Sequence, residues 1–214
     1  MASKVKITDQ KELEEFVRTH LGHRLTAMIS PICLPQDHPL WTCPCRRNDA
    51  YRAAKEGSYV MLRLFIEFLG VKGTDKAPWK LNARTSLKGG KDVYETDLVL
   101  SCFTDFKGVA LQNLSGTDFA KDEALIAEVH RTLCKINAHF TYDTSKPKPY
   151  DRIASPPDKD WTKAIEIVVT KLDERFYQKV NQPIVLHYDL VGSFAERFTG
   201  LKSNIKGDGL GPPK

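Results

Sequence analysis

The sequence predicts a mainly α-helical protein, an antiparallel helical bundle with long irregular loops. Residues 48–70, 118–140 and 160–180 carry apolar side chains at every third or fourth position, the spacing of one helix face. Isolated helices of this kind are marginal in water, so these three are expected to bury their apolar faces against one another. Residues 92–114 fit either a short pair of strands or one or two helical turns, and the sequence leaves both open.

Residues 48–70 predict the central helix of the bundle. Arg63 and Glu67 stand four positions apart on its polar side as an oppositely charged pair. Val60, Leu64 and Ile66 lie outside the main apolar stripe, so the C-terminal half of this helix is expected to be covered on more than one side. The stripe itself consists of Tyr51, Ala54, Ser58, Met61, Leu62, Phe65, Phe68 and Leu69.

A further helix is predicted over residues 9–21, because Asp9 followed by Glu12 is the pattern of a capping box. Whether it continues beyond Gly22 stays open. His20 falls in the apolar stripe of this helix, one turn before Arg24. A polar group in such a stripe needs a partner, so His20 is expected to be a satisfied core histidine rather than a ligand.

The segments between the helices are predicted to be irregular. Residues 31–44 and 141–159 hold four prolines each, and residues 71–90 form a connector that is long for a compact domain. We expect one helical domain over residues 1–200 and a flexible tail over residues 201–214, where glycine, lysine and proline dominate.

The composition is that of a soluble globular protein, with 41% hydrophobic and 28% charged residues in a chain of 214. The net charge of +5 permits contact with nucleic acid or other anions without requiring it. The N-terminus lacks the apolar core of a signal peptide, and no apolar run approaches a membrane span. The predicted location is therefore cytoplasmic, with no membrane partner and with the five cysteines present as reduced thiols.

The first candidate site is a zinc-binding loop formed by Cys33, His38, Cys43 and Cys45. Thiolates and a neutral imidazole are a zinc ligand set, and zinc is the only cofactor the sequence suggests. The spacing differs from the usual C-x2-C knuckle, and the alternative is a proline-rich loop whose small thiols pack beneath Trp41.

The second candidate site is Arg131, Lys135 and His139, which recur every four positions and so share one helix face. A histidine beside fixed cations can move protons near neutral pH, and the cations can hold a phosphodiester. The alternative is a solvated charged face in which Glu128 pairs with one of the cations. The chain has no Gly-rich phosphate loop, H-E-x-x-H, G-x-S-x-G or paired CxxC, so nucleotide-triphosphate hydrolysis, zinc proteolysis and serine hydrolysis lack support.

Two stretches resemble the HEPN superfamily of helical-bundle proteins. They are Ala50-Tyr-Arg-Ala-Ala, continued by Met61-Leu-Arg-Leu-Phe-Ile-Glu-Phe-Leu-Gly, and His130-Arg-Thr-Leu-Cys-Lys-Ile-Asn-Ala-His-Phe-Thr. The resemblance implies a small antiparallel bundle and, for active members, a metal-independent ribonuclease with an arginine and a nearby histidine in one helix. The chain departs from that signature, because seven residues separate Arg131 from His139.

The sequence thus leads to two functional hypotheses. One is a HEPN-like domain that contacts RNA or a nucleotide, in which His139 would act on a ribose 2′-hydroxyl while Arg131 and Lys135 hold the phosphate. The other is a non-enzymatic interaction or scaffold module that uses residues 71–90 and 141–159 as binding surfaces. Either could bind a protein partner or form a homodimer.

Overall fold

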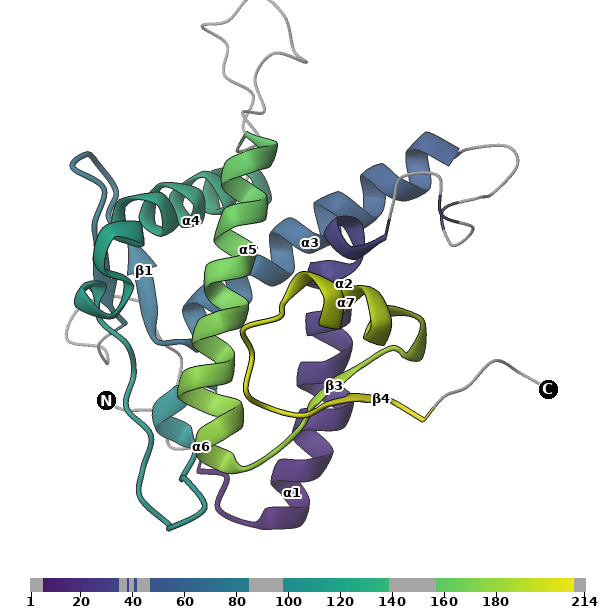
Figure 1. The fold of residues 1–214 in the computed structure, drawn as a ribbon. Helices are drawn as coiled ribbons and strands as arrows, with labels where there is room; N and C mark the ends of the chain where they lie inside the picture. Colours follow the sequence, from purple (N-terminus) through teal and green to yellow (C-terminus); the bar gives the residue numbers. More distant parts are fainter. Residues whose placement is uncertain are drawn as a thin grey trace, which may run out of the picture.

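The computed structural model describes residues 6–34, 38, 41, 47–84, 98–138 and 157–209, except for the side chains of residues 47–49 and 135–138. Figure 1 shows long helices packed against one another, with two short pairs of strands beside them. The predicted mainly α-helical class is confirmed. Within these ranges no helix is both long and apolar enough to cross a membrane.

The N-terminal part of the chain is one continuous helical rod. It consists of α1 (Gln10–Glu15), a π-helical turn (Phe16–Leu21) and α2 (Gly22–Cys33). The Asp9 carboxylate accepts a hydrogen bond from the backbone N–H of Glu12 at 2.9 Å, so the predicted N-terminal cap is confirmed. The rod is longer than the helix predicted over residues 9–21.

The helical rod passes through Gly22 without a break, and the missing side chain there allows another part of the backbone to approach closely. A Cβ atom there would lie 2.8 Å from the carbonyl oxygen of Val185, which belongs to the strand Ile184–Leu186 (β3). Pro31 lies within the last turn of α2, so the expectation that the loop begins at residue 31 is wrong. The chain leaves the helix at Leu34, whose backbone is extended.

The predicted central helix is confirmed as α3 (Arg47–Phe68), which runs antiparallel to the rod. The Ser58 hydroxyl donates to the carbonyl oxygen of Met28 at 2.5 Å, and the rings of Phe68 and Phe16 meet at 6.4 Å. The predicted apolar stripe of α3 is buried or half-buried along its whole length.

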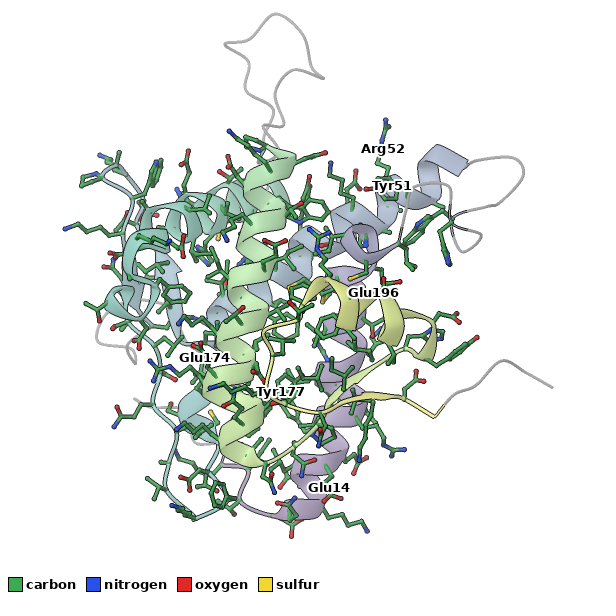
Figure 2. All side chains as sticks on the ribbon, viewed as in Figure 1. Glu14, Tyr51, Arg52, Glu174, Tyr177 and Glu196 are labelled. Atoms are coloured by element: carbon green, nitrogen blue, oxygen red, sulfur yellow. The ribbon has the colours of Figure 1, made fainter. Side chains whose placement is uncertain are left out.

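The polar side of α3 is less covered than the sequence predicts. Of the three apolar residues outside the stripe, Ile66 is fully buried, whereas Val60 and Leu64 are 37% and 40% exposed. The expectation of cover on more than one side is therefore confirmed at Ile66 and wrong at Val60 and Leu64. Arg52 extends away from the helix (Figure 2). Arg63 and Glu67 form the predicted ion pair, with Arg63 Nε 2.8 Å from Glu67 Oε1.

A short antiparallel strand pair follows α3. It joins β1 (Val71–Gly73) to β2 (Leu81–Ala83) within the stretch predicted to be a connector. Residues 92–114 could have held a strand pair, but their described part, residues 98–114, contains no such pair. It contains a 3₁₀ turn (Leu100–Cys102) and isolated β-bridges. A Cβ atom at Gly73 would lie 2.3 Å from the carbonyl oxygen of Ala127. The glycine therefore lets β1 lie directly against the next long helix.

The two other predicted long helices are also present. A 3₁₀ segment (Gly116–Asp122) leads into α4 (Glu123–Ala138), and α5 (Asp158–Leu172) continues through a π-helical turn (Asp173–Tyr177) into α6 (Gln178–Val180). Figure 1 shows α5 beside the α1–α2 rod, running in the opposite direction, whereas α4 lies across α5 rather than along it.

The C-terminal segment packs onto the helices. The strand β3 pairs in parallel with β4 (Ile205–Gly207), and α7 (Val191–Arg197) lies between them in sequence. Asp173, which is buried at the start of the π-helical turn after α5, accepts hydrogen bonds from the backbone N–H groups of Lys202 and Ser203 at 2.9 and 3.0 Å. Part of the segment predicted to be a flexible tail is therefore bonded to the helical domain.

Candidate functional site

The structure places only part of the predicted Arg131, Lys135 and His139 site. Arg131 lies on α4, and its Nη1 atom is 3.2 Å from Oδ1 of the exposed Asp75 in the β1–β2 connection. Lys135 lies one turn further along α4, but its side chain, like the whole of His139, is outside the described residues. The proposed phosphate-binding role of these residues stays a prediction.

The predicted zinc loop is described only at two of its four residues. Cys33 ends α2, where burial raises the pKa of its thiol to about 12. His38 is half-buried, and Cys43 and Cys45 lie outside the described residues. Only Cys33 and His38 of the four candidate ligands are described, so the zinc site stays a prediction.

A polar cluster surrounds Glu67 near the end of α3, and of its contacts the sequence predicts only the Arg63–Glu67 pair. Its Oε1 atom is 2.8 Å from Arg63 Nε and 3.3 Å from His130 Nε2, and its Oε2 atom is 3.6 Å from Arg84 Nη1. Burial disfavours the Glu67 carboxylate, but these three donors outweigh it and lower its pKa to about 2. Glu67 is therefore ionised and fixed in orientation at neutral pH.

The hydrogen bonds of His130 determine which ring nitrogen carries its proton. The backbone N–H of Gly73 in β1 donates to His130 Nδ1 at 3.1 Å, so Nδ1 is an acceptor. With Nδ1 accepting this bond, the ring hydrogen lies on Nε2, from which it is donated to Glu67. His130 is only 4% exposed, and it joins α4 to both β1 and α3.

Cys134 completes a group of potential metal ligands with Glu67 and His130. A metal ion at Nε2 would require the other ring nitrogen to carry the hydrogen, but Nδ1 already accepts the N–H of Gly73. The guanidinium groups of Arg63 and Arg84 also oppose a cation beside Glu67. These residues do not fit a metal ion.

Cys134 does not form a nucleophile–base pair with His130 either. Its Sγ atom is 3.7 and 3.8 Å from the two ring nitrogens, and it is directed at neither in preference to the other. Because Nδ1 accepts from Gly73 and Nε2 donates to Glu67, no ring nitrogen is left to take the thiol proton. The cluster is best understood as a fixed polar support.

This support forms part of the wall of a pocket of about 570 Å³. The pocket lies between the N-terminal rod and the C-terminal end of α3, and Glu67 and Arg84 belong both to it and to the polar cluster. The π-helical turn of the rod, Phe16–Leu21, supplies three of the residues that line the pocket. Such π-turns within α-helices recur at functional sites. The lining residues are Ile7, Glu12, Glu15, Phe16, His20, Leu21, Arg24, Leu64, Phe65, Glu67, Phe68, Arg84 and Leu98.

The structure corrects the expectation for His20, which is exposed at the pocket rather than buried in the core. Its ring lies 5.9 Å from that of Phe16. The guanidinium of Arg24 donates to the carbonyl oxygen of His20 at 3.0 Å, so the two residues form one basic edge of the pocket. The predicted proximity of His20 and Arg24 is confirmed, although their environment was not foreseen.

Comparison of the chain with protein-family models, with curated proteins and with solved structures finds no match. The function must therefore be argued from the pocket and the polar cluster themselves.

Proposed function

We propose that this protein binds a small ligand with a largely apolar body in the pocket between the N-terminal rod and α3. The observation that supports the proposal is an apolar pocket of about 570 Å³ with one rigid polar wall. Small-molecule sites commonly have volumes of roughly 300–1,000 Å³, apolar linings and a few fixed polar groups. Phe16, Phe65 and Phe68 supply the apolar and aromatic surface here.

The polar wall is fixed before any ligand arrives. Glu67 is held by Arg63, Arg84 and His130, and His130 is in turn held by the backbone of Gly73. A wall that is already ordered loses little conformational freedom on binding, which favours affinity.

Binding fits this wall better than acid–base catalysis does. A carboxylate with a pKa of about 2 is a weak base, and both Glu67 oxygens already face donors. The imidazole of His130 is likewise engaged at both nitrogens. The polar cluster is therefore suited to shaping a binding site.

The proposal is tested with 1-anilinonaphthalene-8-sulfonate, a fluorescent probe that has an aromatic body and one anionic group. Leu64→Trp adds bulk at a pocket-lining position, whereas Val60→Trp adds the same bulk one turn earlier on α3, outside the lining. Because both positions are similarly exposed, the two variants form a matched pair. Circular dichroism checks that both keep the helical fold.

We expect the unmodified protein to bind the probe saturably with one site per chain. Leu64→Trp should weaken that binding at least tenfold, which corresponds to about 1.4 kcal/mol, and Val60→Trp should leave it within about twofold. Absence of saturable binding, or equal loss in both variants, contradicts the proposal.

A further inference from the structure

We infer that the ligand is an extended apolar zwitterion, of the class of short apolar peptides with free termini. Its ammonium group would lie at Glu12 and Glu15, and its carboxylate at Arg24. This inference rests on the proposed binding function of the pocket and adds the chemical class and the direction of the ligand.

The first observation is that the acidic groups gather at one end of the pocket. Glu12 and Glu15 lie in α1 at the N-terminal end of the rod, and both are exposed. Within the part of the chain that the structure describes, neither carboxylate forms an ion pair. This end of the pocket therefore has negative charge that a ligand ammonium group can match.

The other end of the pocket is basic. Arg24 lies in α2, and its guanidinium is held beside His20 by the hydrogen bond to the His20 carbonyl. A guanidinium presents several N–H donors in one plane, which suits a carboxylate. The pocket is therefore polarised along the rod, from acidic in α1 to basic in α2.

In the middle of the pocket the charged side chains already form ion pairs with one another. Glu67 is paired there with Arg84 and Arg63, so its charge needs no partner from the ligand. Phe16 and Phe65 line the same region. A ligand that crosses it should therefore be apolar, with its charges at its ends.

The rod sets the distance between those two charges. Glu12 and Arg24 are twelve residues apart in one continuous helical rod, a separation of about 18 Å at roughly 1.5 Å per residue. The separation from Glu15 is about 13 Å on the same basis. An extended peptide advances about 3.3 Å per residue, so four or five residues span this range. A single amino acid is too short to reach both ends.

The inference is tested by calorimetric titration of the full chain with a Leu-Leu-Phe-Leu tetrapeptide in four forms. These have both termini free, the N-terminus acetylated, the C-terminus amidated, or both termini blocked. Glu12→Gln combined with Glu15→Gln removes the acidic end, and Arg24→Gln removes the basic end. Glu14→Gln and Arg18→Gln are the matched controls, because both are exposed residues of the same rod that do not line this pocket.

We expect the free peptide to bind at least tenfold more tightly than the doubly blocked peptide. The Glu12/Glu15 variant should lose the preference for a free ammonium group, Arg24→Gln should lose the preference for a free carboxylate, and both controls should keep both preferences. Equal binding of all four forms, no binding of any form, or preferences that survive in the pocket variants overturns the inference. Saturable binding of the fluorescent probe alongside any of these results shows that the proposed pocket function stands while the ligand class is wrong.

Discussion

Replacement of His130 by alanine tests the polar support of the pocket most sharply. The backbone N–H of Gly73 would lose its acceptor in a buried place, which costs about 1–3 kcal/mol. Glu67 would lose one of its three donors, and removal of a ring that is only 4% exposed would leave a cavity. Together these effects should lower the free energy of unfolding by about 3–5 kcal/mol.

A series at the same position separates these contributions. In His130→Asn the side-chain oxygen stands one bond beyond Cγ, as Nδ1 does, so it can still accept the Gly73 N–H. We therefore expect His130→Asn to be less destabilised than His130→Ala by about 1–2 kcal/mol. His20→Ala, at an exposed position, is the control and should change stability by less than about 0.5 kcal/mol.

Urea denaturation followed by circular dichroism measures all three variants at neutral pH. The tautomer assigned to His130 would be wrong if His130→Asn were no more stable than His130→Ala. The structural role of the cluster would be wrong if His130→Ala unfolded at the same urea concentration as the unmodified protein.

Two further predictions concern stability. The pKa of Glu67 falls from 4.5 to about 2 on folding, so its charge stabilises the protein above about pH 4.5, and this contribution is lost as the pH falls towards 2. In acid titrations, the difference in unfolding free energy between the unmodified protein and Glu67→Gln should therefore shrink over that interval. A constant difference would contradict the assignment. Gly22→Ala should destabilise the protein by about 1–3 kcal/mol, because the new Cβ would meet the Val185 carbonyl. Gly57→Ala, which has open space around it in the middle of α3, should stabilise the protein by about 0.5–1 kcal/mol in the same urea assay. Equal effects of the two changes would refute the packing argument.

Much of the helical framework could be predicted because its signals are local. The apolar spacing of α3, the Asp9 cap and the Arg63–Glu67 pair each depend on residues within one helix. Such patterns carry their own physical cause, since a cap or a pair four positions apart forms wherever the helix forms.

The continuation of the rod and the position of the strand pair depend on distant contacts. The missing side chain of Gly22 leaves room for the carbonyl oxygen of Val185, and that of Gly73 admits the close approach of Ala127. Neither neighbour can be identified from the local sequence. A three-residue strand such as β1 also has too few positions to show an alternating pattern.

The pocket was missed for the same reason. It forms where the rod meets the end of α3, and His130 supports it from a third helix. One signal for it is visible in the sequence, the polar pair His20 and Arg24 at an apolar stripe, a pattern that by itself indicates a core histidine. In the structure both residues are exposed and line the pocket.

The most direct test of the account is an amide NMR titration of the ¹⁵N-labelled protein with the free-terminus tetrapeptide. The account predicts saturable shift changes concentrated in two segments, Glu12 to Arg24 of the rod and Leu64 to Phe68 of α3. No residue of β3 or β4 lines this pocket, so their amides should change less than those of the two segments. Shift changes centred on those strands, or none at saturating peptide, would contradict the proposed pocket and its ligand.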